Sequence, residues 1–167
     1  MKLLIADDDV GTAEALAVYM RLSGFDVETV FDGLGAIFAL NRRQPHAAFL
    51  DIDMPGATGL EVARAIRLQE ANQRHTLLIA MTGRSPSDEA ATTCAEAGFD
   101  HHVSKPASPD KLLQLLRDYE IFLADDALAE ISPRRCRRPL SHNRYRCEFT
   151  VRRWRGAVDH PAFTTVS

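Results

Sequence analysis

The sequence predicts an α/β fold in which a five-stranded parallel sheet carries helices on both faces. Short apolar segments, which suit buried strands, alternate five times with segments of helical periodicity over roughly 120 residues. Regular alternation at this spacing is typical of right-handed crossovers that join parallel strands through a helix. The chain is long enough for one such domain with some surplus, but not for two.

The N-terminal part supplies two strands and two helices. Lys2–Ala6 is a short apolar run that three acidic residues end, and Val27–Val30 is the second strand. The helix between them ends near Gly24, and its apolar face holds Ala13, Leu16, Ala17 and Met20. Asp32 is in position to cap the second helix. The predicted apolar face of that helix holds Ile37, Phe38 and Leu40.

The third strand, Ala47–Leu50, delivers Asp51 at its carboxyl end. Met54-Pro55-Gly56 follows within a few residues and cannot continue a strand. We expect a third helix over about residues 59–70, and a fourth strand in the continuous apolar run Leu77–Met81.

The fourth helix is expected to begin with Ser85 as its cap, followed by Pro86 and Asp88. Its inner face offers only small side chains, namely Ala90, Ala91, Cys94 and Ala95. Because small side chains bury little area, we expect this helix to dock weakly and to shift easily. A short fifth strand is expected at His101–Val103, and Ser108-Pro109-Asp110 caps a last helix. That helix is expected to bury Leu112, Leu113, Leu115 and Leu116.

The composition is that of an ordinary soluble globular protein, with 46% apolar and 26% charged residues. No apolar run approaches the roughly 20 residues of a membrane span, and no signal peptide precedes the first strand. The three cysteines, Cys94, Cys136 and Cys147, lack metal-ligand spacing. An odd number of cysteines without such spacing favours a reduced, cytoplasmic setting.

The net charge of −3 conceals two parts of opposite sign. Residues 1–132 carry 11 basic and 21 acidic side chains, whereas residues 133–167 carry 9 Arg and 2 acids. We therefore expect a domain over residues 1–124 and a basic tail over residues 125–167. Three interpretations of the tail stay open. It is a disordered segment, a nucleic-acid-binding segment in which Tyr145, Phe149 and Trp154 stack on bases, or a frame-shifted end.

Polar side chains follow four of the five predicted strands. Asp7 and Asp8 follow the first strand, Asp51 the third, Thr82 the fourth and Lys105 the fifth. Because parallel strands end at one edge of a sheet, we expect these side chains to converge. Clustered carboxylates repel one another unless a cation lies among them, and oxygen ligands with room for water suit Mg²⁺. A hydroxyl and an ammonium opposite that metal suit the oxygens of a phosphoryl group.

Over about residues 1–120 the chain resembles the receiver domains of two-component response regulators, and most closely those attached to hybrid histidine kinases. The resemblance rests on Asp7-Asp8, on Asp51 with Met54-Pro55 and Gly59 behind it, on Thr82, and on Lys105-Pro106. It implies a doubly wound, flavodoxin-like fold. It also implies a histidine kinase or a histidine phosphotransfer protein as the partner. Because the pattern of an output domain does not follow the receiver region, we expect a stand-alone receiver.

The resemblance assigns a role to each of these residues. Asp51 is implied as the phosphoacceptor, and Thr82 and Lys105 as the catalytic residues that hold the phosphoryl oxygens. Asp8, Asp51 and the backbone carbonyl of Asp53 are implied as ligands of Mg²⁺, with Asp7 acting through water. The Lys105-Pro106 peptide is expected to be cis, as it is in that family. Such a domain catalyses its own phosphorylation and dephosphorylation and is not a conventional enzyme.

Two positions depart from the commonest pattern of the family. His102 stands where a Tyr or Phe usually acts as the switch ring; it is either a weaker, pH-sensitive switch or simply exposed polar surface. Asp53 and Arg84 flank the expected site and are candidates for a charge pair across it. We expect the surface for a downstream partner at residues 86–103 and 108–120, because the fourth helix has the fewest large apolar anchors.

Two other classes of function match parts of the sequence. Asp51-Ile52-Asp53 mimics the paired-Asp motif of Mg²⁺-dependent phosphatases of the haloacid dehalogenase type. In those enzymes the strand with the nucleophile comes first and the acidic pair last, so the leading Asp7-Asp8 argues against this class. The other alternative is a nucleic-acid-binding regulator that acts through its basic tail. No contact with a membrane is expected.

Overall fold

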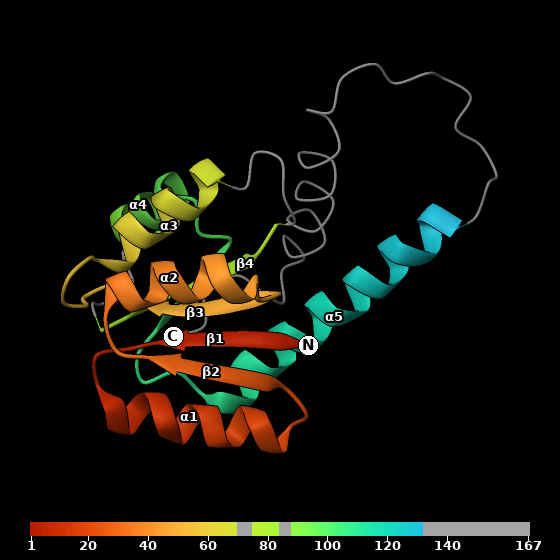
Figure 1. Cartoon of the computed structure of the whole chain (residues 1–167), viewed down its shortest axis with the longest axis horizontal. Coiled ribbons are helices and arrows are strands. Elements are labelled where there is room, and N and C mark those ends of the chain that lie inside the picture. Colours follow the sequence, from red (N-terminus) through yellow and green to blue (C-terminus); the bar gives the residue numbers. More distant parts are fainter. Residues whose placement is uncertain (70–74, 84–87, 132–167) are drawn as a thin grey trace. The chain divides into compact units, whose positions relative to one another are not determined.

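The computed structural model describes residues 1–69, 75–83 and 88–131, and it confirms the predicted fold class. Five parallel strands form one sheet in the order β2-β1-β3-β4-β5 (Figure 1). The strands are β1 (Lys2–Ala6), β2 (Asp26–Val30), β3 (Ala47–Asp51), β4 (Leu77–Thr82) and β5 (His101–Ser104). The helices are α1 (Val10–Leu22), α2 (Gly33–Arg43), α3 (Gly59–Gln69), α4 (Asp88–Ala97) and α5 (Pro109–Ile131).

The chain divides into two compact units, and the first, residues 1–113, contains the whole sheet. Of the second unit, which begins at Gln114, the structure describes the C-terminal part of α5. That helix continues through the predicted domain boundary at residue 124 and ends at Ile131. The predicted basic tail lies almost entirely outside the described residues.

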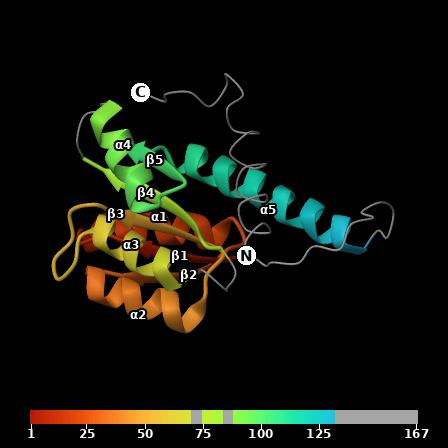
Figure 2. The same ribbon diagram turned by 90° about the horizontal axis from the view of Figure 1, so that it is seen from above.

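Helices cover both faces of the sheet within the first unit. Side chains alternate between the faces along each strand, so Leu4, Leu50 and Leu78 project toward α2, α3 and α4, where they form one buried cluster. On the opposite face lies α1, which buries Ala13, Leu16, Ala17 and Met20 as predicted (Figures 1 and 2). The strands β3 and β4 are buried throughout because both of their faces are covered.

Side-chain caps fix the start of three helices at the C-terminal edge of the sheet, where the strands end. Asp9 caps α1 by accepting hydrogen bonds from the backbone N–H of Gly11 at 2.9 Å and Thr12 at 3.2 Å. Asp32 caps α2 as predicted and accepts from Gly35 N at 2.6 Å. Before α3, Thr58 and Glu61 form a reciprocal capping box. These caps hold the loops of that edge at defined positions.

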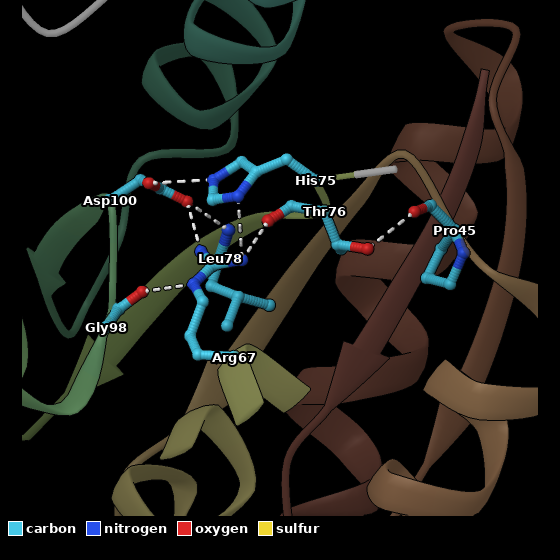
Figure 3. Close-up of polar contacts among 7 residues, drawn as sticks. All are labelled: Pro45, Arg67, His75, Thr76, Leu78, Gly98 and Asp100. Atoms are coloured by element: carbon cyan, nitrogen blue, oxygen red, sulfur yellow. Dashed lines mark hydrogen bonds and ion pairs between the residues drawn. The ribbon is translucent and has the colours of Figure 1, made fainter. Parts of the chain in front are cut away.

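A partly buried polar cluster joins α3, β4 and β5 at the opposite, N-terminal edge of the sheet (Figure 3). The Asp100 carboxylate, 1% exposed, accepts a hydrogen bond from Arg67 Nη2 at 2.6 Å and contacts His75 Nε2 at 3.2 Å. It also accepts the backbone N–H of Leu78 at 2.9 Å. Arg67 further donates to Gly98 O at 2.8 Å. We refer to Arg67, His75 and Asp100 as the Asp100 cluster, which pins the start of β4 and β5 to the end of α3.

Two packing predictions were wrong. Phe38 is 68% exposed, and Ala36, Ala39 and Leu40 form the buried face of α2. Small residues there let α2 lie close to the sheet, while the Phe38 ring lies under the Arg42 guanidinium at 5.9 Å. Among the α4 residues whose burial is described, from Ala91 onward, Cys94 and Ala97 are buried, whereas the predicted Ala95 is exposed.

Three further expectations have mixed outcomes. In α5, Leu112 and Leu116 are buried, whereas Leu113 and Leu115 are only partly so. The predicted cap of the fourth helix at Ser85 and Pro86 lies outside the described residues, which resume at Asp88. The expected small inner face of α4 is supported where it is described, because its buried side chains there are Cys94 and Ala97.

Candidate functional site

Asp51 lies at the C-terminal edge of the sheet, at the end of β3. Since β3 runs between β1 and β4, Asp51 stands between the ends of both neighbours. Burial of β3 on both faces leaves the Asp51 side chain only 8% exposed. Asp7 follows the end of β1 and is fully buried, and Thr82 at the end of β4 is 3% exposed.

Lys105, directly after β5, bridges two of the carboxylates. Its Nζ lies 2.7 Å from Asp7 Oδ2 and 2.9 Å from Asp51 Oδ2. The backbone N–H of Lys105 donates to Thr82 O at 2.7 Å, which fixes where the side chain leaves the strand. The Lys105-Pro106 peptide bond is cis.

Three carboxylates gather beside this ammonium. One carboxylate oxygen each from Asp7, Asp8 and Asp51 lies within 4.8 Å of the others, while Asp8 is exposed. The second oxygen of Asp7 is already engaged, because Asp7 Oδ1 accepts the backbone N–H of Asp9 at 3.1 Å. The donor set is therefore all oxygen, partly buried and open to solvent at Asp8, which fits a hard divalent cation with retained water.

The electrostatics of the site follow from burial and from the ion pairs. Burial raises the pKa of Asp51, and the nearby Asp7 carboxylate adds to this, although Lys105 opposes it. Burial alone would lower the pKa of Lys105, but its hydrogen bonds to Asp7 and Asp51 outweigh that effect and raise it. The ammonium therefore stays charged near neutral pH and offsets much of the repulsion between the two carboxylates.

Other predicted site residues are placed at the rim or away from the site. The Asp53 side chain is exposed, and the Asp53 backbone N–H donates to the Asp51 carboxylate. His102 is exposed in the middle of β5, opposite Ala80. Arg84 lies outside the described residues, so its pairing with Asp53 stays a prediction.

Sequence reasoning missed two features of this edge. The Asp9 side chain is committed to capping α1, a role that the acidic run at the end of β1 left open. Gly59 lies so close to β3 that an added Cβ would stand 2.2 Å from Asp51 O. The signal for Gly59 was its place in the family pattern, but only the folded backbone gives the physical reason for a glycine there.

Comparison with known proteins decides the family. A sequence model described as the response regulator receiver domain matches residues 3–117, which is more than half of the chain. The chain belongs to the response regulator receiver family. Receiver domains of this family are signalling domains that interact with histidine kinases, rather than conventional enzymes.

Curated relatives of this receiver are response regulators. The DNA-binding response regulator MtrA of Mycolicibacterium paratuberculosis is 28% identical over 116 residues, which cover 70% of this chain and 49% of the relative. The response regulator MprA of Mycobacterium avium is 31% identical over 117 residues, covering 70% and 50% respectively. The chain thus spans about half the length of the curated relatives it matches.

Solved structures resemble the receiver over the same region. A Francisella response regulator receiver domain superposes with a TM-score of 0.64 at 28% identity, covering 70% of this chain and 93% of that one. The chemotaxis response regulator CheY4 of Vibrio cholerae gives a TM-score of 0.64 at 27% identity, covering 70% and 95%. Within the described residues, no helix is both long and apolar enough to span a membrane.

Proposed function

We propose that this receiver accepts a phosphoryl group on Asp51 from a phosphohistidine of a histidine kinase or a phosphotransfer protein. The observation that carries the proposal is the contact of the Asp51 carboxylate with Lys105 Nζ at 2.9 Å, beside the carboxylates of Asp7 and Asp8. A nucleophile, a fixed cation and a set of metal ligands are the parts that phosphoryl transfer requires.

Magnesium fits this donor set. Asp8 and Asp51, with the backbone carbonyl of Asp53, are the proposed direct ligands, and Asp8 is exposed and so accessible to an incoming hydrated ion. Asp7 is proposed to act through water, because its two oxygens already contact Lys105 and the backbone N–H of Asp9. When bound, the metal supplies charge neutralisation for the phosphoryl oxygens.

In the transfer itself, a carboxylate oxygen of Asp51 attacks phosphorus in line with the departing imidazole. The O–P bond forms as the P–N bond breaks, and the electron pair of that bond stays on the imidazole nitrogen, which takes a proton from solvent. Lys105 neutralises charge that develops on the equatorial oxygens. Burial raises the pKa of Asp51, whereas the ion pair with Lys105 acts to lower it and so helps to keep the attacking carboxylate ionised.

The acyl phosphate is proposed to act as a switch through Thr82 and α4. Thr82 is buried at the end of β4, next to the site, and α4 follows it in the chain. The described part of α4 buries only small side chains, Cys94 and Ala97, so a change at Thr82 of a few kcal/mol suffices to reposition it. The partner surface is proposed on α4 and β5, with His102 exposed on that strand.

The test uses acetyl phosphate as a small phosphodonor and gel or mass detection of the phosphorylated chain. We expect Asp51→Ala and metal chelation each to abolish labelling. Asp26→Ala is the matched control, because Asp26 is an exposed aspartate on β2 that pairs with Arg43. Asp8→Ala is expected to weaken Mg²⁺ binding strongly. Labelling of Asp51→Ala at the wild-type rate would overturn the proposal.

A further inference from the structure

Gly33, the first residue of α2, lies against the connection that follows the proposed phosphoacceptor. Its backbone N–H donates to Pro55 O at 3.0 Å. A Cβ added at Gly33 would stand 1.9 Å from Ala57 O and 2.6 Å from the carbonyl carbon of Ala57. Gly33 is not among the described glycines with positive φ, so the position requires glycine for space and not for backbone conformation.

The connection in question, residues 52–58, links β3 to α3 and is held at both ends. Gly59 N donates to Ile52 O at 2.9 Å, and the capping box of Thr58 with Glu61 fixes the first turn of α3. The Asp53 backbone N–H, at the other end, donates to the Asp51 carboxylate. Ile52 N also donates to Met81 O at 3.1 Å, which anchors the β3 end. A displacement of Ala57 must therefore be taken up by residues 53–57 between the two anchored ends, and this segment includes the Asp53 peptide.

We propose that Gly33 is a positioning residue for the proposed magnesium and phosphoryl site. The absence of a side chain lets the first turn of α2 contact the backbone of Ala57 directly, and this contact sets the position of the Asp53 peptide beside Asp51. The inference rests on the proposed function, since the Asp53 carbonyl is a proposed ligand. Backbone packed on backbone has no flexible side chain to absorb a displacement, so movement of α2 reaches the site.

The experiment compares Gly33→Ala with Gly35→Ala. Both substitutions add one methyl group to the first turn of α2, but the atoms nearest to a Cβ at Gly35 are the side-chain oxygens of Asp32, at 3.3 Å and 3.5 Å. In Gly33→Ala the Ala57 carbonyl must retreat from 1.9 Å to at least the 3.0 Å that real Cβ contacts keep. The first readout is the amide NMR shifts and hydrogen exchange of residues 53–57 in protein free of metal and phosphate.

We expect these amides to shift and to exchange faster in Gly33→Ala and to stay near wild type in Gly35→Ala. Calorimetric titration with Mg²⁺ should then show an affinity about 10- to 100-fold weaker for Gly33→Ala alone, the range typical of lost support behind a metal ligand. Unchanged amides and affinity in folded Gly33→Ala would overturn the inference. Equal changes in both variants would also overturn it, because they would reflect a general effect on α2.

A second variant covers the case in which Gly33→Ala does not fold. Ala57→Gly removes a methyl group from the same contact, since a Cβ at Gly33 would stand 2.8 Å from Ala57 Cβ. We expect faster exchange at residues 53–57 and a smaller loss of Mg²⁺ affinity, and wild-type exchange would refute the inference. Failure of the wild-type chain to accept a phosphoryl group would contradict the proposed function only. The amide shifts and exchange rates of residues 53–57 are compared without metal or phosphate, so they test the role of Gly33 independently.

Discussion

At the scale of single residues, the site is a balance between crowded carboxylates and one ammonium. Lys105 contacts both Asp7 and Asp51, and all three lie in partly or fully buried surroundings. Removal of the ammonium leaves two close carboxylates without their cation, which costs more than the loss of an exposed ion pair. At neutral pH, the metal-free protein thus depends on Lys105 for the stability of the site as well as for contact with substrate.

We expect Lys105→Met to destabilise the metal-free protein by about 1.5–3 kcal/mol, the usual range for a hydrogen bond to a charged group. Urea unfolding in the presence of a chelator measures this, and added Mg²⁺ should restore part of the loss. Lys111→Met is the control, because Lys111 is an exposed lysine early in α5. Equal stability of both variants would contradict the expectation.

The ionised Asp51 carboxylate is expected to lower the free energy of unfolding at neutral pH when no metal is bound. The pKa of Asp51 is raised in the folded protein, chiefly by burial. Protonated Asp51 therefore adds to the free energy of unfolding below the unfolded pKa of about 3.9, and this contribution is lost as pH rises through the folded pKa. Asp51→Asn should therefore unfold at a higher temperature than wild type at pH 7 in chelator, with a smaller difference near pH 4. A lower melting temperature for Asp51→Asn at pH 7 would show that its ion pair with Lys105 outweighs burial.

The residues of the site could be predicted to a large extent because strand ends are visible in the sequence. Asp51, Thr82 and Lys105 each follow an apolar run, and a parallel sheet brings such positions together. The sequence did not separate the buried Asp7 from the exposed Asp8, since that depends on which way each peptide turns after β1. Gly33 also escaped prediction, because its neighbour Ala57 is 24 residues away in the chain.

At the scale of elements, the Asp100 cluster is a polar link between α3 and the sheet. Burial would raise the pKa of Asp100, but His75, Arg67 and the Leu78 N–H together lower it. The contacts join three segments, of which the one with Gly98 and Asp100 lies more than 30 residues from Arg67. Gly98 and Thr76 contribute their carbonyl oxygens to Arg67. Sequence periodicity cannot reveal such a cluster, because no local pattern connects its members.

We expect Asp100→Asn to destabilise the protein at pH 7 by on the order of 3 kcal/mol, because it leaves Arg67 without its buried carboxylate. The pKa of Asp100 is lowered in the folded protein. Its ionised carboxylate therefore adds to the free energy of unfolding above about pH 3.9, and this contribution is lost as pH falls through the folded pKa. Chemical unfolding of wild type and variant at pH 7 and at decreasing pH measures both effects.

The matched control for that cluster is Asp26→Asn, which removes an exposed partner of Arg43. An exposed pair of this kind contributes only about 0–1 kcal/mol. A loss for Asp100→Asn as small as that for Asp26→Asn, or a difference from wild type that grows at low pH, would show that the Asp100 carboxylate is not a net stabilising group.

Helix faces were predicted less well than helix positions. The sequence predicts Phe38 on the buried face of α2, whereas in the structure Ala36 and Ala39 occupy that face and Phe38 is exposed. Hydrophobicity alone favours the large ring, but α2 and α3 share one face of the sheet, and the close packing there is achieved with small residues. Only the tertiary packing distinguishes the two choices.

At the scale of the whole chain, the sheet topology follows from five alternations, and the receiver family follows from residues 3–117. The charge division at about residue 133 is equally plain in the sequence. Residues 133–167 carry nine Arg and two acidic side chains. Their basic composition motivates a comparison of the full chain with a chain that ends at Ile131.

We expect the chain that ends at Ile131 to accept phosphate from acetyl phosphate at a rate within about twofold of the full chain, since every proposed site residue precedes Pro106. Any affinity of the full chain for a DNA duplex should fall steeply with salt and be absent from the shortened chain, because the nine Arg lie in residues 133–167. A strong loss of labelling on shortening would place part of the receiver machinery beyond Ile131.

The strand order has one more consequence, which concerns how copies of the protein behave when concentrated. The outermost strands are β2 and β5, and outermost strands present unpaired peptide groups to other chains. β5 is only four residues long, and β2 carries Asp26 and Glu28, which form ion pairs with arginines of α2. A short strand on one side and a charged one on the other give a second chain little to pair with, so the sheet discourages its own extension into aggregates.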